Sequence, residues 1–86
     1  MFKKNNFGKF QCPCCDYYTL KSDFENSFEM CDVCYWENDG IQLNDCNYEG
    51  GANRPSLIQA RENFRRHGAS EECLKEYVRE PFKNEL

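Results

Sequence analysis

Apolar and polar residues alternate over short stretches in the first third of the chain. The alternation is visible at 7–11 and 27–30, and the segment 17–20 is aromatic and β-branched. A period of two residues and these residue types predict β-strands. We therefore expect short strands at 7–11, 17–20 and 27–30, and a fourth at 41–43 after the turn signal of 38–40.

The apolar period becomes helical after residue 55. Three apolar residues fall on one face of a helix over 56–67: Leu57, Ala60 and Phe64. Ser56 and Gln59 have the spacing of a capping box at the start of this helix. Gly68 stands where a left-handed residue ends it.

A second helix is predicted at 70–79, with Ser70 as its N-cap and Pro81 blocking its continuation. Residues 83–86 are then expected to fray. Residues 44–55 form the loop between the two halves. The pattern as a whole predicts one α+β domain over 1–86, a small antiparallel β-sheet followed by two short C-terminal α-helices.

Cysteines bracket the middle of the predicted sheet as two C-x2-C pairs separated by fifteen residues. The four residues concerned are Cys12, Cys15, Cys31 and Cys34. This spacing is typical of a zinc site, because two tight turns can each supply two thiolates to a tetrahedral ion. We expect one structural Zn²⁺ per chain, in a zinc-ribbon-like unit over about residues 7–43.

A third thiol, that of Cys14, crowds the first turn. The x2 spacing of the second pair assigns the outer cysteines of 12–15 to the metal and leaves Cys14 as a bystander. A closed shell of four cysteines leaves no open position for a substrate, which favours a role other than catalysis. An enzyme or thiol redox factor that uses Cys14 with the loops 36–40 and 51–54 stays an alternative.

The length and cysteine count narrow the class of protein. A chain of 86 residues builds a small core, so a metal site would supply a large share of its stability. The seven cysteines are odd in number, and no apolar segment follows the N-terminal lysines, which argues against a secreted disulfide scaffold. No stretch approaches the roughly 20 apolar residues of a membrane span. We expect a cytoplasmic protein that does not enter a membrane.

Charge is unevenly distributed along the chain. Residues 1–10 carry +3, residues 11–50 carry −8 and residues 51–86 carry +1. Zinc with four thiolates would make the middle block more negative still. Such a surface repels phosphate, so nucleic-acid binding is disfavoured and another protein is the expected partner.

Two polar loop segments, 36–40 and 51–54, are candidates for a recognition surface. They combine an aromatic residue with charged and amide side chains: Trp36, Glu37, Asp39, Asn53 and Arg54. A structural interpretation competes with this one. Trp36 would then cover the metal turn, while Asn53 and Arg54 would tie the loop to the sheet.

An ordered set of short motifs runs through the same segments. Cys-Pro-Cys-Cys at 12–15, Cys-Tyr-Trp-Glu-Asn-Asp-Gly at 34–40 and Gly-Gly-Ala-Asn-Arg at 50–54 are followed by Ser-Leu at 56–57. Over about residues 10–81 the chain resembles the small bacterial cysteine-rich CPCC family. The resemblance implies a zinc-binding domain and names no activity.

The sequence also departs from that family. Asp16 stands where members commonly have glycine, after the second cysteine of the first turn. This position favours a positive φ, which Asp tolerates and a bulky residue adopts only with strain. Because Tyr35 holds the equivalent position in the second turn, we expect that turn to be looser or differently shaped.

Overall fold

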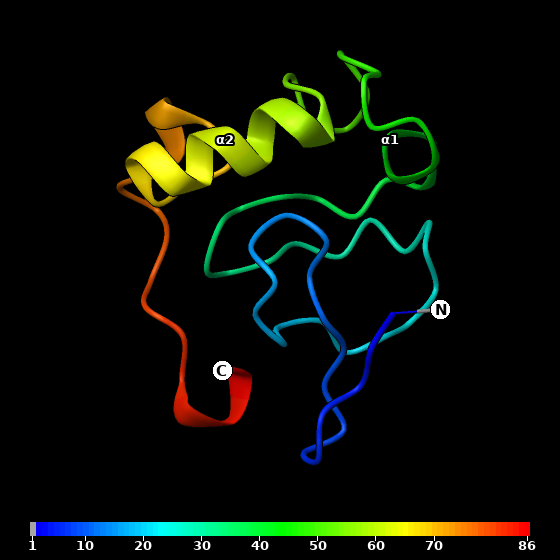
Figure 1. The fold of residues 1–86 in the computed structure, drawn as a ribbon, viewed down its shortest axis with the longest axis vertical. Helices are drawn as coiled ribbons and strands as arrows, with labels where there is room; N and C mark the ends of the chain where they lie inside the picture. The colour runs from blue at the N-terminus through cyan, green and yellow to red at the C-terminus, as the bar shows by residue number, and fades with distance from the viewer. Residues whose placement is uncertain (1) are drawn as a thin grey trace.

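The computed structural model describes residues 2–86. Within them, two α-helices and two 3-10 turns follow one another: α1 (Gly40–Asn44), α2 (Leu57–His67), η1 (Glu72–Leu74) and η2 (Lys83–Glu85). Helix α2 lies across one end of the coiled N-terminal half, and the chain after it runs down the side of the molecule to η2 (Figure 1). The C-terminal segment therefore returns to the N-terminal half.

The predicted antiparallel β-sheet is wrong. Among the described residues, β-pairing is confined to isolated antiparallel bridges, which join Lys4 to Phe10, Phe10 to Leu20, and Met30 to Glu37. The middle bridge is well formed, since the amides of Phe10 and Leu20 each donate to the other's carbonyl at 2.8 and 3.0 Å. The pairing does not propagate beyond these positions.

Side chains take the backbone hydrogen bonds that a sheet would use. The carboxylate of Glu29 accepts from the amides of Lys21 and Ser22, at 2.7 and 3.3 Å. The side-chain amide of Asn38 donates from Nδ2 to the carbonyl of Phe24 at 3.0 Å. The chain also turns at Phe28, where φ is 56°. Alternating residues predicted extended backbone, but a ladder needs uninterrupted neighbouring strands, and these segments lack them.

The fourth predicted strand is also wrong, because residues 41–43 belong to helix α1. The Asp39 carboxylate accepts from the amides of Ile41 and Gln42, at 2.8 and 3.4 Å, and so caps the helix. The turn signal at 38–40 is thus a helix start, in which an acidic residue satisfies amides that have no partner in the first turn.

The first predicted C-terminal helix is present as α2. Ser56 Oγ accepts from the amide of Gln59 at 3.2 Å, and the Gln59 side chain accepts from the amide of Ser56 at 2.9 Å. Gly68 follows with φ 79°. Leu57 and Ala60 on the apolar face are buried, and Phe64 packs against the core. The prediction of this helix and of both its caps is confirmed.

The second predicted α-helix is wrong. Residues 72–74 form only the 3-10 turn η1, whose N-cap Glu71 makes no side-chain capping hydrogen bond. Ser70, the expected cap, is buried, and its amide donates to the carbonyl of Cys34 at 2.7 Å. Without a side-chain cap, a short segment with few apolar contacts of its own gains too little to form a full α-helix.

The expected fraying of 83–86 is wrong as well. These residues include η2, and Glu85 is 2% exposed. The amide of Tyr18 donates to the carbonyl of Glu85 at 2.7 Å, and the Asn5 side chain donates to the carbonyl of Asn84 at 2.8 Å. The last residues are therefore fixed to the N-terminal half.

Cysteines form the centre of the core. Five of them are buried together with aliphatic and aromatic side chains: Cys12, Cys14, Cys15, Cys31, Cys34, Leu20, Val33, Trp36, Leu57 and Ala60. The fold thus encloses a sulfur cluster between the N-terminal coil and α2.

In the part of the chain described, no helix has the length and apolar character needed to cross a membrane.

Candidate metal centre

The two C-x2-C turns share one backbone geometry. In the first, the amide of Asp16 donates to the carbonyl of Cys12 at 3.0 Å, and in the second the amide of Tyr35 donates to the carbonyl of Cys31 at 2.7 Å. The φ angles of Asp16 and Tyr35 are 70° and 71°. The expectation of a different second turn is wrong.

Contacts around Tyr35 compensate for this strain. Its ring stacks on that of Tyr77, with centroids 5.8 Å apart and planes 26° from parallel. A positive φ costs a bulky residue about 1–2 kcal/mol, which a stacked aromatic pair can largely offset. The second turn therefore keeps its shape without glycine.

Four sulfur atoms converge where the turns face each other. The Sγ atoms of Cys12, Cys15, Cys31 and Cys34 all lie within 4.8 Å of one another, and all four residues are buried. Two cross-turn distances, Cys12 to Cys34 and Cys15 to Cys31, are both 3.7 Å. Sulfurs about 2.3 Å from a tetrahedral ion lie about 3.8 Å apart, so the group has the dimensions of a four-thiolate metal site.

Nearby donors face the sulfur atoms. The Cys14 amide lies 3.4 Å from Cys12 Sγ, and the Thr19 hydroxyl lies 3.0 Å from Cys31 Sγ. Such hydrogen bonds stabilise negative charge on thiolates and orient them toward a metal. Cys14 itself is buried, although its sulfur is not one of the four that converge.

The electrostatics of the cluster require a cation if all four thiols are to ionise. Burial raises the pKa of Cys12. Hydrogen bonds from the other thiols, that of Cys12 first, lower the pKa of Cys31. One thiolate is thus stabilised by its neighbours, whereas several at this distance repel one another. A divalent ion removes the repulsion, so the donor set fits a metal.

Later parts of the chain hold both turns in place. Arg61 on α2 donates from Nε to the carbonyl of Pro13 at 2.8 Å. The amides of Ser70 and Arg79 donate to the carbonyls of Cys34 and Asp32, at 2.7 and 3.2 Å. Helix α2 and the C-terminal segment therefore fix the distance between the two cysteine pairs.

The family of the chain follows from a comparison of its sequence with family models. The model of the cysteine-rich CPCC family matches residues 10–85, nearly the whole length. The chain belongs to the cysteine-rich CPCC family. The resemblance seen in the sequence is confirmed, and the match extends through Glu85. No curated protein matches the chain significantly.

The recognition residues predicted in this CPCC domain occupy different environments. Trp36 is 1% exposed, and Asp39 and Asn53 are also buried. Glu37 is half-buried and Arg54 is exposed. These last two residues line a small cavity of about 240 Å³, which Trp36 and Asp39 do not reach.

Two of the buried residues, Asp39 and Asn53, belong to a polar network that joins the sequence motifs 34–40 and 50–54. The Asn53 side chain accepts from the amide of Glu37 and donates to its carbonyl, both at 2.8 Å. It also donates to Gln42 Oε1 at 2.9 Å. Asp39 adds a hydrogen bond from the amide of Ala52 at 2.9 Å. The network fastens the loop 51–54 to the segment after the second turn.

Sequence reasoning missed Gln42, the centre of this network. Gln42 is fully buried, and its Nε2 donates to three loop carbonyls, those of Tyr48, Asn53 and Pro55, at 3.1, 3.0 and 3.0 Å. A glutamine in the short strand predicted at 41–43 gives no signal of such a role. The Asp-Gly step before it, interpreted as a helix start, would have placed Gln42 in the first turn of α1.

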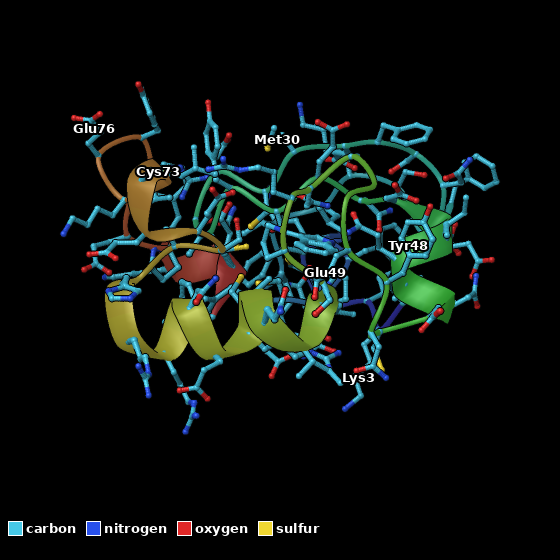
Figure 2. The ribbon with its side chains drawn as sticks, turned by 90° about the horizontal axis from the view of Figure 1, so that it is seen from above. Lys3, Met30, Tyr48, Glu49, Cys73 and Glu76 are labelled. Atoms are coloured by element: carbon cyan, nitrogen blue, oxygen red, sulfur yellow. The ribbon has the colours of Figure 1, made fainter. Side chains whose placement is uncertain are left out.

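The two cysteines outside the turns have separate surroundings. Cys46 is half-buried and packs against the core. Cys73 is exposed on η1, near Glu76 and away from the α1 end of the molecule where Tyr48 lies (Figure 2). Its sulfur contacts Arg54 Nη2 at 3.6 Å and Glu71 Oε2 at 3.3 Å. Neither cysteine belongs to the four-sulfur group.

Proposed function

We propose that this chain is a cytoplasmic structural-zinc domain that acts as a protein-interaction module. The observation that carries the proposal is the convergence of four buried sulfur atoms, with two cross-turn distances of 3.7 Å. Zn²⁺ suits this donor set, since it favours tetrahedral thiolate coordination and has no redox chemistry. Four thiolates complete the coordination shell, so the metal would hold the fold together.

The proposed location follows from the same chemistry. Thiolates remain available to zinc where cellular reductants prevent disulfide formation, as they do in the cytoplasm. All seven cysteines of the chain are free thiols in the structure. A chain with this many thiols needs such surroundings to remain in one metal-bound form.

Surface composition supports a protein partner. Several large apolar side chains are at least half exposed, among them Phe7, Phe24, Phe28, Ile41, Tyr77 and Phe82. Exposed apolar side chains that gather into one patch are a feature of protein-binding surfaces, and Phe28 and Ile41 line one such groove. The negative charge of residues 11–50 supports the same choice over nucleic acid.

Metal analysis and chelation test the structural part of the proposal. We expect one zinc per chain by native mass spectrometry. Stripping the metal should collapse the dispersed amide NMR spectrum, and added zinc should restore it, because metal binding and folding are linked. A metal-free chain with a fully dispersed spectrum would show that the core is stable alone and would contradict the proposal.

The interaction part has its own test. Affinity purification from the native cell with the metal intact should recover a partner protein, while the chelated chain serves as the control. Recovery with the chelated chain alone would indicate adhesion of an unfolded polypeptide and would contradict the interaction role. Recovery of nucleic acid in place of protein would also contradict it.

A further inference from the structure

An apolar groove with an acidic rim opens beside α1. Its volume is about 590 Å³. Phe28 and Ile41 line it with 50% and 61% of their surfaces exposed. Its acidic rim is formed by Glu25, which is half-buried, and Asp45, which is exposed. Asp39 also lines the groove, but its carboxylate is buried and caps α1, and none of the lining residues is basic. The groove therefore favours an apolar side chain that is accompanied by positive charge.

Backbone strain at Phe28 contributes to this groove. Its φ of 56° is unfavourable for an aromatic residue, yet its amide is fixed by a hydrogen bond to the carbonyl of Asn38 at 2.8 Å. The strained residue leaves half of its surface in solvent instead of adding it to the core. Strain that persists while exposing an aromatic ring points to a binding role for that ring.

The same chain carries a complementary feature in its N-terminal tip, residues 5–9. Phe7 is 69% exposed there. Asn5 Oδ1 accepts from the amides of Phe7 and Lys9, both at 3.0 Å, so the turn is formed before any contact. Residues 1–10 carry three lysines and no acidic residue, and the side chain of Lys3 points outward (Figure 2). The tip thus presents one exposed aromatic ring close in sequence to Lys9, and Lys3 and Lys4 directly precede the tip.

We propose that the groove binds the N-terminal tip of a second copy of this chain. The ring of Phe7 would pack between Phe28 and Ile41, and the lysines near it would face the acidic rim. Charge complementarity favours this occupant, because residues 1–10 carry +3 with no acidic residue, more positive charge than the other acid-free stretches 50–61 and 63–70, which carry two arginines each. Phe7 within it is also the most exposed of the large apolar side chains. The inference deepens the proposed interaction function by naming its partner.

The contact has to be made between molecules. The N-terminal tip and α1 lie near opposite ends of the long axis, so one chain cannot place its own tip in its own groove (Figure 1). Tip and groove are different surfaces, which makes each contact heterologous. Two copies can exchange tips side by side, or many can associate head to tail.

Sedimentation of the zinc-loaded chain tests the inference with three variants. Phe7→Ser removes the ring of the tip, and Ile41→Ser removes a wall of the groove. Ile58→Ser is the control, since Ile58 is a 46% exposed isoleucine on α2 outside the groove. We expect wild type to associate reversibly with concentration, and less so in high salt. Each of the first two variants should weaken association at least about tenfold, and the control should not.

Mixing gives the decisive measurement. Phe7→Ser keeps an intact groove and Ile41→Ser keeps an intact tip, so an equimolar mixture should recover association that neither variant shows alone. Failure of the mixture to recover it, an equal loss with Ile58→Ser, or a wild type that stays monomeric at millimolar concentration would overturn the inference. In the last case the groove would be left for a different protein.

Metal content and amide dispersion are recorded for every sample. A sample that binds zinc and stays folded without associating contradicts the tip-in-groove contact alone. Loss of zinc from wild type contradicts the proposed zinc function itself. The two failures are therefore distinguishable.

Discussion

The guanidinium of Arg79 and the carboxylate of Glu85 meet in two parallel hydrogen bonds of 2.8 and 2.9 Å. The Glu85 side chain is 3% exposed and that of Arg79 is 32% exposed. The guanidinium also lies 3.8 Å from the centroid of the Phe82 ring, whose amide donates to Glu85 at 2.8 Å. The pair folds the C-terminal segment back beside the second cysteine turn, where the Arg79 amide contacts Asp32.

A double-mutant cycle measures the strength of this pair. Arg79→Gln, Glu85→Gln and the double variant should give a coupling free energy of about 2 kcal/mol, because truncating one partner leaves a charge with little access to water. Urea unfolding of the zinc-loaded proteins provides the values. The exposed pair of Glu62 and Arg66 on α2 is the control and should show little coupling. Equal coupling in both pairs would contradict this account.

The same carboxylate should make stability depend on pH. Arg79 and then the amide of Phe82 lower the pKa of Glu85 below its ordinary value of 4.5. A lowered pKa in the folded state means that the stabilisation is full above the unfolded value and is lost as the pH falls through the folded one.

The stability difference between wild type and Glu85→Gln should therefore be constant from pH 7 to about pH 5 and shrink as the pH falls below the ordinary value of 4.5. Taking a difference cancels the effect of acid on the cysteines, which both proteins share. Unfolding curves at stepped pH provide the check, and a difference that grows in acid would contradict the assignment.

Serine substitution in the cysteine turns separates metal ligands from the bystander. Cys14→Ser should keep about one zinc per chain and a folded spectrum, because its sulfur lies outside the converging group. Cys12→Ser, Cys15→Ser, Cys31→Ser and Cys34→Ser should each lose tight zinc binding and most of the fold, since a closed shell tolerates no missing ligand. Metal-to-protein ratios by mass spectrometry provide the check. Zinc loss in Cys14→Ser with retention in Cys15→Ser would overturn the assignment.

Asn53 offers a test of the buried polar network. Asn53→Ala removes both hydrogen bonds to the Glu37 backbone and one to Gln42. We expect a loss of about 2–3 kcal/mol in the free energy of unfolding, because buried groups are left without partners. The exposed Asn47 provides a matched control, in which the same substitution should change stability little. A small effect at Asn53 would mean that water replaces the amide.

Local sequence signals determined the elements whose causes are local. The spacing of Cys12, Cys15, Cys31 and Cys34 identified the converging sulfurs, because a C-x2-C turn needs few residues beyond its own. Helix α2 was predictable for the same reason. Its cap residues Ser56 and Gln59 lie within one turn of each other, so neighbouring residues define its start.

Tertiary contacts decided what local signals could not. Ser70 is buried with its amide bonded to the carbonyl of Cys34, no side-chain cap forms at the following turn, and the second predicted helix is reduced to η1. Glu29 and Asn38 satisfy backbone groups that the predicted sheet would have paired. The tail is ordered because Glu85 pairs with Arg79, and because the backbones of these two residues bond to Tyr18 and Asp32, far away in the sequence. The sheet and the tail both depend on hydrogen bonds between separated residues, such as Asn38 with Phe24 and Tyr18 with Glu85. Local sequence does not specify these pairs, because the residues meet only once the sulfur-centred core has formed.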